Sequence, residues 1–426
     1  MRGDNTLPLL VKGYTWLPEV GRRQDAGGLV RTRLLGRPVR VLQGPGLVAF
    51  FYDERHARRS GALPGPVLDT LCGRGAVHTL DGPEHRTRKA LFLSQLTETA
   101  RVRALTACVC AEFRETFDGL RGREVTLFDE GALVLARAVS RWAGLPGYRA
   151  ADAERLARDC VAMVDGFATP GPRHLRARRA RARQEELLRR AVVRARGSRE
   201  PGKRTSGHGA AGEQREAGNA ARTPFEAVLA HREADGSLLD PATAAVELLN
   251  ILRPTVAITW FTTFAAHAMR DAPELRRRLA ADEPVGLATS FAHEVRRFYP
   301  FVPFLAALAP EGVELQGEPV PHGTMLLLDV YGQNHDSALW DEPFRFVPDR
   351  FLGAAPHPDT LIPQGGGPRE GHRCPGEDIT IAVLSALTRE LARLDFTVPD
   401  QDVRIPLHRI PTRPRDGFRM RVPGDG

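Results

Sequence analysis

The stretch Gly365–Glu377, which reads GGGPREGHRCPGE, places a single cysteine directly before an apolar helix. Pro375 and Glu377 favour the first turn of a helix, so Cys374 is expected at or beside the helix N-terminus. There the helix dipole and free N–H groups favour a thiolate, and the preceding glycines would let the backbone approach a large flat ligand closely. Such a thiolate is either a nucleophile or a metal ligand. A zinc site would need three more ligands nearby, and no CxxC or HxxxH pair accompanies this cysteine.

The composition is that of a globular protein. Of the 426 residues, 42% are hydrophobic and 26% are charged, which excludes a mainly disordered, collagen-like or disulfide-stapled chain. The opening MRGDNTLPLLVKGYTW does not have the pattern of a signal peptide, and no run of about 18 apolar residues predicts a transmembrane helix. Five scattered cysteines fit reduced thiols better than a disulfide framework. We therefore expect a cytoplasmic protein without a membrane anchor.

The net charge of +8 raises the question of a nucleic-acid partner. Only three of the 60 basic residues are lysines, and arginine is enriched together with alanine, glycine and proline along the whole chain. This pattern indicates a codon bias more than a selected basic face. The densest run, Arg173–Arg183, could attract phosphates, but a solvated helix face is the simpler interpretation. We expect no nucleic-acid partner.

The spacing of the apolar residues predicts a mainly α-helical fold with a small β region. Short β-prone runs occur in residues 1–50 and around 304–330, and a coil rich in proline and glycine runs on to residue 376. Apolar spacings of three and four predict helices through residues 86–120, 125–145 and 151–168. Residues 197–223 have no such period and are interpreted as a flexible surface insertion. The chain is expected to fold as one unit, residues 1–426.

An arginine and a proline interrupt the most apolar predicted helix. Residues 240–261 read DPATAAVELLNILRPTVAITWF, with helix-start signals at Asp240 and Pro241. A buried arginine at position 253 is costly unless an anion pairs with it. Pro254 in a helix interior costs about 3 kcal/mol and frees the carbonyl group of Asn250. Two adjacent penalties indicate a function. The alternative is a kink in which Arg253 pairs with an internal glutamate.

Three motifs resemble those of the haem-thiolate cytochrome P-450 superfamily. His372–Gly376 (HRCPG) matches the end of its cysteine loop, Glu294–Arg297 (EVRR) matches its E-x-x-R, and Pro348–Phe351 (PDRF) matches its P-x-R-F segment. Each motif alone is weak evidence for this superfamily. Their order and separations together are specific, and the resemblance covers essentially the whole chain.

This resemblance implies the cytochrome P-450 fold, a helical prism around haem b, with Cys374 as the axial ligand of the iron. Glu294 and Arg297 share one helix face and would form an ion pair that Arg350 joins. The chain departs from the superfamily in one respect. The phenylalanine that usually opens the glycine-rich loop is replaced by Pro363–Gln364 and a longer insert.

A second segment is similar to one that contacts the haem propionates in bacterial members. Residues 81–89 read DGPEHRTRK, and His85 and Lys89 at i, i+4 lie on one helix face, as two groups that bind one anion require. The resemblance adds His372 as a third partner of the propionates. Taken alone, this segment could equally be an exposed basic helix.

Ordinary monooxygenases of the superfamily carry an acid–alcohol pair where this chain has Arg253 and Pro254. With the surrounding LLNILRPTVA, this resembles the fatty-acid peroxygenase subfamily. The resemblance implies that Arg253 binds the substrate carboxylate over the haem, with Pro254 and Asn250 beside it. The carboxylate would take a proton from hydrogen peroxide and return it to the distal oxygen. Oxidation at the α or β carbon is expected, because the anchored carboxylate holds those carbons nearest the iron.

His78 matches a position that this subfamily fills with glutamine or histidine. Members with histidine there tend to decarboxylate fatty acids to terminal alkenes as well as hydroxylate them, which implies a catalytic role for His78. Cys72 replaces the phenylalanine usual near this position, which loosens the wall of the substrate site around the histidine. Taken alone, His78 would more often be a structural histidine.

The leading interpretation is a peroxide-dependent haem-thiolate enzyme that oxidises a long-chain fatty acid and needs no redox partner. The alternative is a haem-thiolate monooxygenase that is fed by a redox partner and acts on another carboxylic acid. A non-catalytic haem or nucleic-acid binder is favoured only by the arginine excess. Arg253 argues against a binder, which has no need of a carboxylate clamp.

Overall fold

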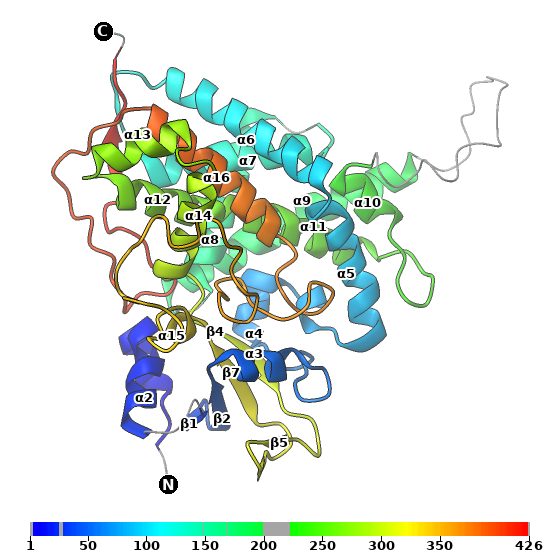
Figure 1. Ribbon diagram of the computed structural model, residues 1–426. Coiled ribbons are helices and arrows are strands. Elements are labelled where there is room, and N and C mark those ends of the chain that lie inside the picture. Colours follow the sequence, from blue (N-terminus) through cyan, green and yellow to red (C-terminus); the bar gives the residue numbers. More distant parts are fainter. Residues whose placement is uncertain (1–2, 25–28, 148, 168, 199–221, 425–426) are drawn as a thin grey trace.

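The computed structural model describes residues 3–24, 29–147, 149–167, 169–198 and 222–424. Helices fill one half of the molecule, and the larger sheet lies at the opposite end, beside the N-terminus (Figure 1). The prediction of a mainly α-helical fold with a small β region is therefore confirmed. The insertion predicted at 197–223 lies, apart from its two ends, outside the described residues.

The helices in chain order are α1 Thr6–Lys12, α2 Trp16–Gln24, α3 Pro45–Tyr52, α4 Gly65–Val67, α5 Gly82–Leu96, α6 Thr99–Asp118, α7 Leu127–Trp142, α8 Ala150–Gly166, α9 Pro172–Gly197, α10 Pro224–Ala230, α11 Pro241–Val256, α12 Ile258–Met269, α13 Pro273–Ala281, α14 Leu287–Phe298, α15 Val330–Asn334 and α16 Glu377–Arg393. Short helical turns are η1 Gly13–Thr15, η2 Leu68–Cys72 and η3 Val77–Thr79. The helices predicted from apolar spacing correspond to α5 through α8.

The strands are β1 Leu29–Leu34, β2 Arg37–Leu42, β3 Glu124–Thr126, β4 Phe304–Leu308, β5 Glu314–Leu315, β6 Glu318–Pro319, β7 Met325–Asp329 and β8 Arg419–Arg421. The larger sheet has the order β1-β2-β7-β4, in which β2 and β7 are parallel and the other pairs are antiparallel. Strand β7 is buried at all five positions, because it lies inside this sheet and both of its faces are covered.

The small sheet predicted in the first 50 residues is present as β1 and β2, but helices α1 and α2 precede it, and the β-prone run at residues 46–51 (GLVAFF) is helical, in α3. Trp16 at the start of α2 is 1% exposed and shares an apolar cluster with Val39 of β2 and Leu327 of β7. The apolar side chains of this segment therefore cover the sheet from a helix instead of extending it.

Helices α11 and α12 form the apolar centre of the helical half. The Asp240 side chain accepts hydrogen bonds from the N–H groups of Ala242 and Thr243, which confirms the predicted start of α11. Helix α11 continues through Pro254 to Val256, and the break comes at Ala257. The stretch Pro241–Met269 is long and apolar enough to cross a membrane, but 94% of its most apolar window is buried inside the fold, as in a core helix of a globular protein.

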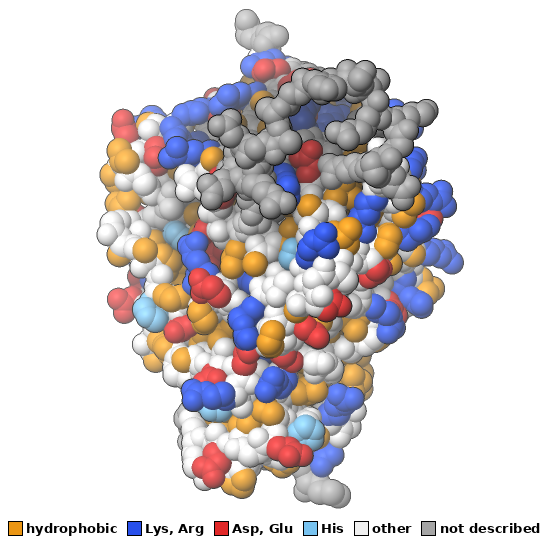
Figure 2. Space-filling view, turned by 90° about the vertical axis from the view of Figure 1, so that its right-hand side faces the viewer, with side chains coloured by type: hydrophobic (Ala, Val, Ile, Leu, Met, Phe, Trp, Pro, Cys, Tyr) orange, Lys and Arg blue, Asp and Glu red, His pale blue; other side chains and the backbone are white. Residues whose placement is uncertain are grey.

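The arginine excess does not form one continuous patch on the face shown in Figure 2. There, basic side chains alternate with acidic and apolar ones. Many of the surface arginines pair with nearby acids on their own helix, such as Arg189 and Arg190 with Glu186 on α9. Such pairs contribute little to stability, and they neutralise the local charge.

Candidate active site

Cys374 lies two residues before Gly376, the N-cap of α16, close to its predicted place at the helix N-terminus. Burial raises the pKa of the Cys374 thiol, and a hydrogen bond from the Gly376 N–H opposes this rise. The sulfur is thus held against a helix start but in surroundings of low polarity. A metal cation bound to the sulfur would hold it as a thiolate.

The glycine-rich loop before Cys374 packs on helix α3. Gly365 and Gly367 have φ values of +91° and +70°, and a Cβ atom on either would overlap Tyr52. A Cβ atom on Gly366 would lie 2.7 Å from Val48 Cγ1. The close approach that these glycines permit is therefore partly to protein atoms of α3, and their approach to a large flat ligand stays a prediction.

Gln364 directs a side-chain amide toward the cysteine sulfur. Its Oε1 accepts a hydrogen bond from Arg296 Nε at 3.1 Å, and its Nε2 donates to Thr380 Oγ1 at 3.0 Å. Because the guanidinium group only donates, this bond fixes the orientation of the amide and turns Nε2 toward Cys374 Sγ, 3.7 Å away. Arg296 is itself buried and ion-paired with Glu377.

A cluster of buried basic side chains lies beside the cysteine loop. The rings of His85 and His372 stack with their centroids 3.8 Å apart, and Lys89 donates to the carbonyl group of Arg373. His85 is 1% exposed and its Nδ1 has no hydrogen-bond partner, while His372 Nε2 lies 3.7 Å from Asp81 Oδ1. Burial lowers the pKa of Lys89 to about 8 and, with the charge on His372, that of His85 to about 3. This donor set fits the acidic groups of a ligand.

Arg59, which the sequence analysis missed, adds to this cluster. It is 7% exposed, its Nη1 has no hydrogen-bond partner, and its charge lowers the pKa of both His85 and His372. Ligand atoms of Glu54, His85 and His372 lie within 4.8 Å of one another, a spacing that could hold a metal ion. The neighbouring positive charges of Lys89 and Arg59 oppose a further cation there, so an anionic ligand is the better fit.

Arg253 projects from α11 without an internal counter-ion. It is 8% exposed, its Nε has no hydrogen-bond partner, and no acidic side chain in the described part of the chain pairs with it. Burial lowers its pKa to about 10. The thiols of Cys72, Cys160 and Cys374 all act on this pKa, so Arg253 lies within electrostatic range of these cysteines. An unpaired buried cation of this kind favours an anionic ligand.

The internal glutamate of α11 pairs with a different arginine. Glu247 is fully buried and accepts from Arg88 Nη1 at 2.7 Å and from the Val77 N–H at 2.8 Å. The alternative in which Arg253 pairs with an internal glutamate is therefore excluded. Glu247 instead fixes the turn η3, which carries His78, against α11.

Asn250 holds the neighbouring segment in place. Its Nδ2 donates to the Cys72 carbonyl group at 2.9 Å and to Glu247 Oε2 at 3.2 Å, while its buried Oδ1 has no partner. In the opposite orientation of the amide, Oδ1 would face the Cys72 carbonyl oxygen and Glu247 Oε2, which are both acceptors. The orientation with Nδ2 toward these two oxygens is therefore required. Since the free atom is itself an acceptor, it would repel a substrate carboxylate. Asn250 therefore positions Cys72 and does not bind an anion, in contrast to its predicted place in the substrate site.

His78 and Cys72 both lie within electrostatic range of Arg253. Burial and the charge of Arg253 lower the pKa of His78 to about 3, so its imidazole is neutral at ordinary pH. The residue nevertheless keeps surface that the described protein atoms do not cover. Cys72 is buried, and burial raises its pKa.

The Glu294 carboxylate binds two arginines. It forms a two-bond contact with Arg297, at 2.7 and 2.8 Å, and accepts from Arg350 Nε at 3.1 Å. Arg297 donates further to the carbonyl groups of Asn334 and Pro343 at 2.8 Å. This ion-pair network therefore fastens the coil after α15 to helix α14.

Comparisons with known proteins agree on one family. A family model described as cytochrome P450 matches residues 285–418. The solved structure of a variant of cytochrome P450SP alpha (CYP152B1) has a TM-score of 0.89 and 37% sequence identity, and the match covers 98% of both chains. A variant of cytochrome P450 OleT in complex with arachidonic acid has a TM-score of 0.88 and 33% identity, over 98% of this chain and 96% of that one. The chain belongs to the cytochrome P450 family.

The matches to curated P450 sequences are shorter. Human cytochrome P450 2D6 is 32% identical over 127 residues, which are 29% of this chain and 25% of that protein. Putative cytochrome P450 137 from Mycobacterium tuberculosis is 32% identical over 157 residues, which are 35% of this chain and 32% of that protein. The matched segment thus spans about a quarter to a third of these relatives.

As a P450, the protein is a haem-thiolate oxidoreductase, and the residues present fit the cofactor. Cys374 would supply the thiolate ligand to iron. The partnerless His85 Nδ1, with His372 and Lys89 beside it, offers donors for the haem carboxylates. Arg59 adds a further free donor to this group.

Gln364, Glu247 and Arg88 also escaped the sequence analysis. Glu247 has the same sequence signal as Arg253, since it is a charged residue within a predicted apolar helix. No local signal marks Gln364 or Arg88, because their partners lie in distant parts of the chain.

Substitution of Gln364 by leucine is expected to make the Cys374 sulfur more electron-rich, because one hydrogen-bond donor to it is lost. A bond of this kind contributes about 0.5–1.5 kcal/mol, equivalent to a reduction potential of the haem iron lower by about 20–60 mV. Redox titration of the haem-loaded protein measures this. A potential that does not change would contradict the proposed contact, and Gln401→Leu, remote from Cys374, is the control.

Substitution of Glu294 by alanine is expected to destabilise the fold by about 3–5 kcal/mol, because it leaves the buried Arg297 and the partly buried Arg350 without their counter-ion. Urea unfolding measures the change. The matched control is Glu342→Ala, which removes an exposed pair with Arg345 and should cost less than about 1 kcal/mol. Equal effects of the two variants would contradict this role.

Proposed function

We propose that this enzyme uses hydrogen peroxide to hydroxylate long-chain fatty acids at the α or β carbon, with decarboxylation to terminal alkenes as a second outcome. The observation that carries the proposal is Arg253, a buried cation with no acidic partner among the described residues. The structures of P450 OleT and P450SP alpha hold arachidonic acid and (R)-ibuprofen, which are both carboxylic acids. A substrate carboxylate is the partner that Arg253 lacks.

The polar side chains of α11 that could move a proton are already engaged. The Thr255 hydroxyl donates to the carbonyl group of Ile251 at 2.9 Å, and Glu247 is held by Arg88. A substrate carboxylate on Arg253 can do the work of the missing acid. It takes a proton from one oxygen of hydrogen peroxide and returns it to the other. This supports peroxide as the oxidant and a reaction that needs no redox partner.

Haem b, held through Cys374, would supply the cleavage of the peroxide O–O bond and the oxidation of a carbon–hydrogen bond. Hydroxylation converts the acid and one hydrogen peroxide into the hydroxy acid and one water. Decarboxylation converts them into the alkene, carbon dioxide and two waters. Arg253 selects the carbons that react, because its contact with the carboxylate holds the α and β carbons at the same end of the site.

His78 would act beside the bound carboxylate. Because its imidazole is neutral, it can form a hydrogen bond there without adding a second positive charge.

We place this proposed reaction in the cytoplasm.

The test is a mixture of haem-loaded protein, palmitate and hydrogen peroxide without any reductase, with the products identified by mass spectrometry. Hydroxy acids, alkenes or both are expected, and their ratio reports on His78 and Cys72. Omission of peroxide is the control. Turnover only with a reductase and NAD(P)H would overturn the proposal in favour of a partner-dependent monooxygenase.

A further inference from the structure

Helix α9 carries the whole net charge of the protein. Of the 60 basic and 52 acidic residues in the chain, ten arginines and two glutamates lie on this helix. The remaining 50 basic and 50 acidic residues are equal in number, so the net charge of +8 belongs to α9. A codon bias enriches arginine along the whole chain, whereas a charge excess confined to one helix indicates a partner of opposite charge.

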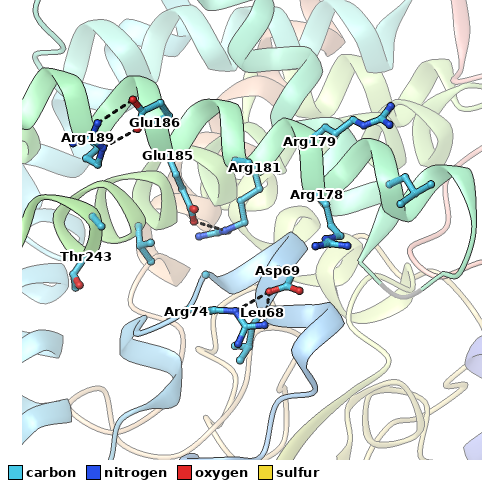
Figure 3. A pocket seen from close by; sticks show the side chains of 15 residues that line it. Leu68, Asp69, Arg74, Arg178, Arg179, Arg181, Glu185, Glu186, Arg189 and Thr243 are labelled. Atoms are coloured by element: carbon cyan, nitrogen blue, oxygen red, sulfur yellow. Dashed lines mark hydrogen bonds and ion pairs between the residues drawn. The ribbon is translucent and has the colours of Figure 1, made fainter.

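Neighbouring acids neutralise only part of this charge. Four acids of α8 and α9 pair with five of the arginines: Asp159 with Arg183, Asp165 with Arg173, Glu185 with Arg181, and Glu186 with Arg189 and Arg190. Four others are exposed and have no acidic partner in the described part of the chain: Arg176, Arg178, Arg179 and Arg194. Figure 3 shows Arg178 and Arg179 extending from α9 apart from its two glutamates.

Large apolar side chains lie between these arginines on the solvent face of α9. Leu175, Leu187 and Val193 are 50%, 41% and 46% exposed. Leu175 and Val193 are about five helical turns apart, so they lie on one line along the helix. The opposite side, which includes Leu188 and Val192, is buried, and the helix packs on α8 and α11. The solvent face of α9 is therefore apolar as well as basic along its length.

A face of this composition fits a lipid membrane better than a nucleic acid. The phosphate groups of either partner would contact the arginines. Exposed leucine and valine gain little from the phosphate backbone of a nucleic acid, whereas in a bilayer they enter the boundary between head groups and acyl chains. A helix with arginines and apolar residues on one exposed face can thus lie in the plane of a membrane surface.

We infer that the solvent face of α9 binds the surface of a membrane that contains anionic lipids. The contact is peripheral, because the helix stays packed on α8 and α11 and only its exposed side chains reach the lipids. The purpose of the contact rests on the proposed function. A long-chain fatty acid partitions into bilayers, since each buried CH₂ group contributes about 0.8 kcal/mol, so the enzyme would be held where its substrate is concentrated.

The binding test is flotation of the haem-loaded protein with phosphatidylcholine vesicles that contain or lack phosphatidylglycerol. The protein should bind the anionic vesicles more tightly than the neutral ones, and added salt should weaken this binding. An Arg178→Glu/Arg179→Glu variant should bind at least about tenfold more weakly, because each arginine near an anionic surface contributes about 1 kcal/mol.

The matched control is Arg103→Glu/Arg123→Glu, which makes the same change of charge at two exposed arginines outside α9. Its effect on vesicle binding should be small. Equal binding to the two kinds of vesicle, or equal effects of the two double variants, would overturn the inference.

A Leu175→Ser/Leu187→Ser variant separates a membrane from a nucleic acid as the partner. Both side chains are about half exposed, so the fold should be retained, which the haem absorption spectrum checks. Binding to the anionic vesicles should weaken about tenfold, because two apolar contacts are lost without a change of charge. Vesicle binding that this variant leaves unchanged, or tighter binding of the wild type to a DNA duplex than to the vesicles, would overturn the assignment to a membrane.

The link to substrate supply is tested with palmitate dissolved in the vesicles. Turnover with hydrogen peroxide should be faster when the vesicles contain phosphatidylglycerol. Arg178→Glu/Arg179→Glu should remove this difference and leave the turnover of soluble decanoate unchanged. Turnover that is independent of phosphatidylglycerol would overturn the role in substrate supply. Absence of turnover with both acids, together with vesicle binding that depends on Arg178 and Arg179, would refute the proposed function and leave the membrane surface standing.

Discussion

An Arg253→Met enzyme is expected to lose fatty-acid turnover while it keeps its haem. Methionine preserves most of the volume of the side chain but cannot bind a carboxylate. Loss of one partner of a buried charge pair costs about 2–5 kcal/mol, so kcat/KM with palmitate and peroxide should fall by about 30- to 5,000-fold. The haem absorption spectrum should stay unchanged, because Cys374 and the His85 cluster are untouched.

The same substitution is expected to stabilise the apoprotein. Arg253 is buried without an acidic partner in the described residues, and replacing such a cation by an apolar side chain raises the free energy of unfolding by about 1–4 kcal/mol. Urea unfolding measures this. Activity within about threefold of the wild type, or a clear loss of stability, would contradict the assigned role. Arg176→Met, at an exposed site on α9, is the control for the loss of one arginine.

A Cys374→Ala protein is expected to lose both activity and thiolate ligation. Alanine removes the thiol that would bind iron, while the His85, His372 and Lys89 cluster that would hold the haem carboxylates remains. Under the proposed function, turnover should fall by at least about 10³-fold, since the thiolate would assist cleavage of the peroxide O–O bond. The iron–sulfur stretching band in the resonance Raman spectrum should disappear, even if some haem is retained.

The control for this variant is Cys110→Ser, which removes a partly buried thiol on α6. It should keep both the iron–sulfur band and the activity. Persistence of the band in Cys374→Ala would assign the ligand to another cysteine, with Cys72 and Cys160 as the buried alternatives near Arg253.

Local sequence signals were sufficient where the partners lie within one element. Asp240 and Pro241 predicted the start of α11, and the spacing of Glu294 and Arg297 predicted their ion pair on α14. The apolar spacing of three and four predicted α5 through α8. The glycine run Gly365–Gly367 signalled a close approach, but only the fold shows that α3 fills part of the space that these glycines leave.

The role of Asn250 shows the same limit. Its place next to Arg253 suggested a contact with substrate, whereas the fold turns its amide to the Cys72 carbonyl group, 178 positions away in the chain. Only the folded structure shows which of its two polar atoms is left free. That atom is an acceptor, and this decides the role.

The sequence by itself determined that a cysteine stands before a helix, that an arginine and a proline lie in a buried apolar segment, and that the fold is mainly helical. These features depend on residues a few positions apart, whose geometry the helix period fixes. Tertiary structure alone decided which buried charges are paired. Glu247 meets Arg88 from 159 positions away, and Arg296 meets Glu377 from 81 positions away, while Arg253 and one nitrogen of Arg181 are left without a partner. Pairing of buried charges depends on distances between elements, and those distances are set only when the helices pack.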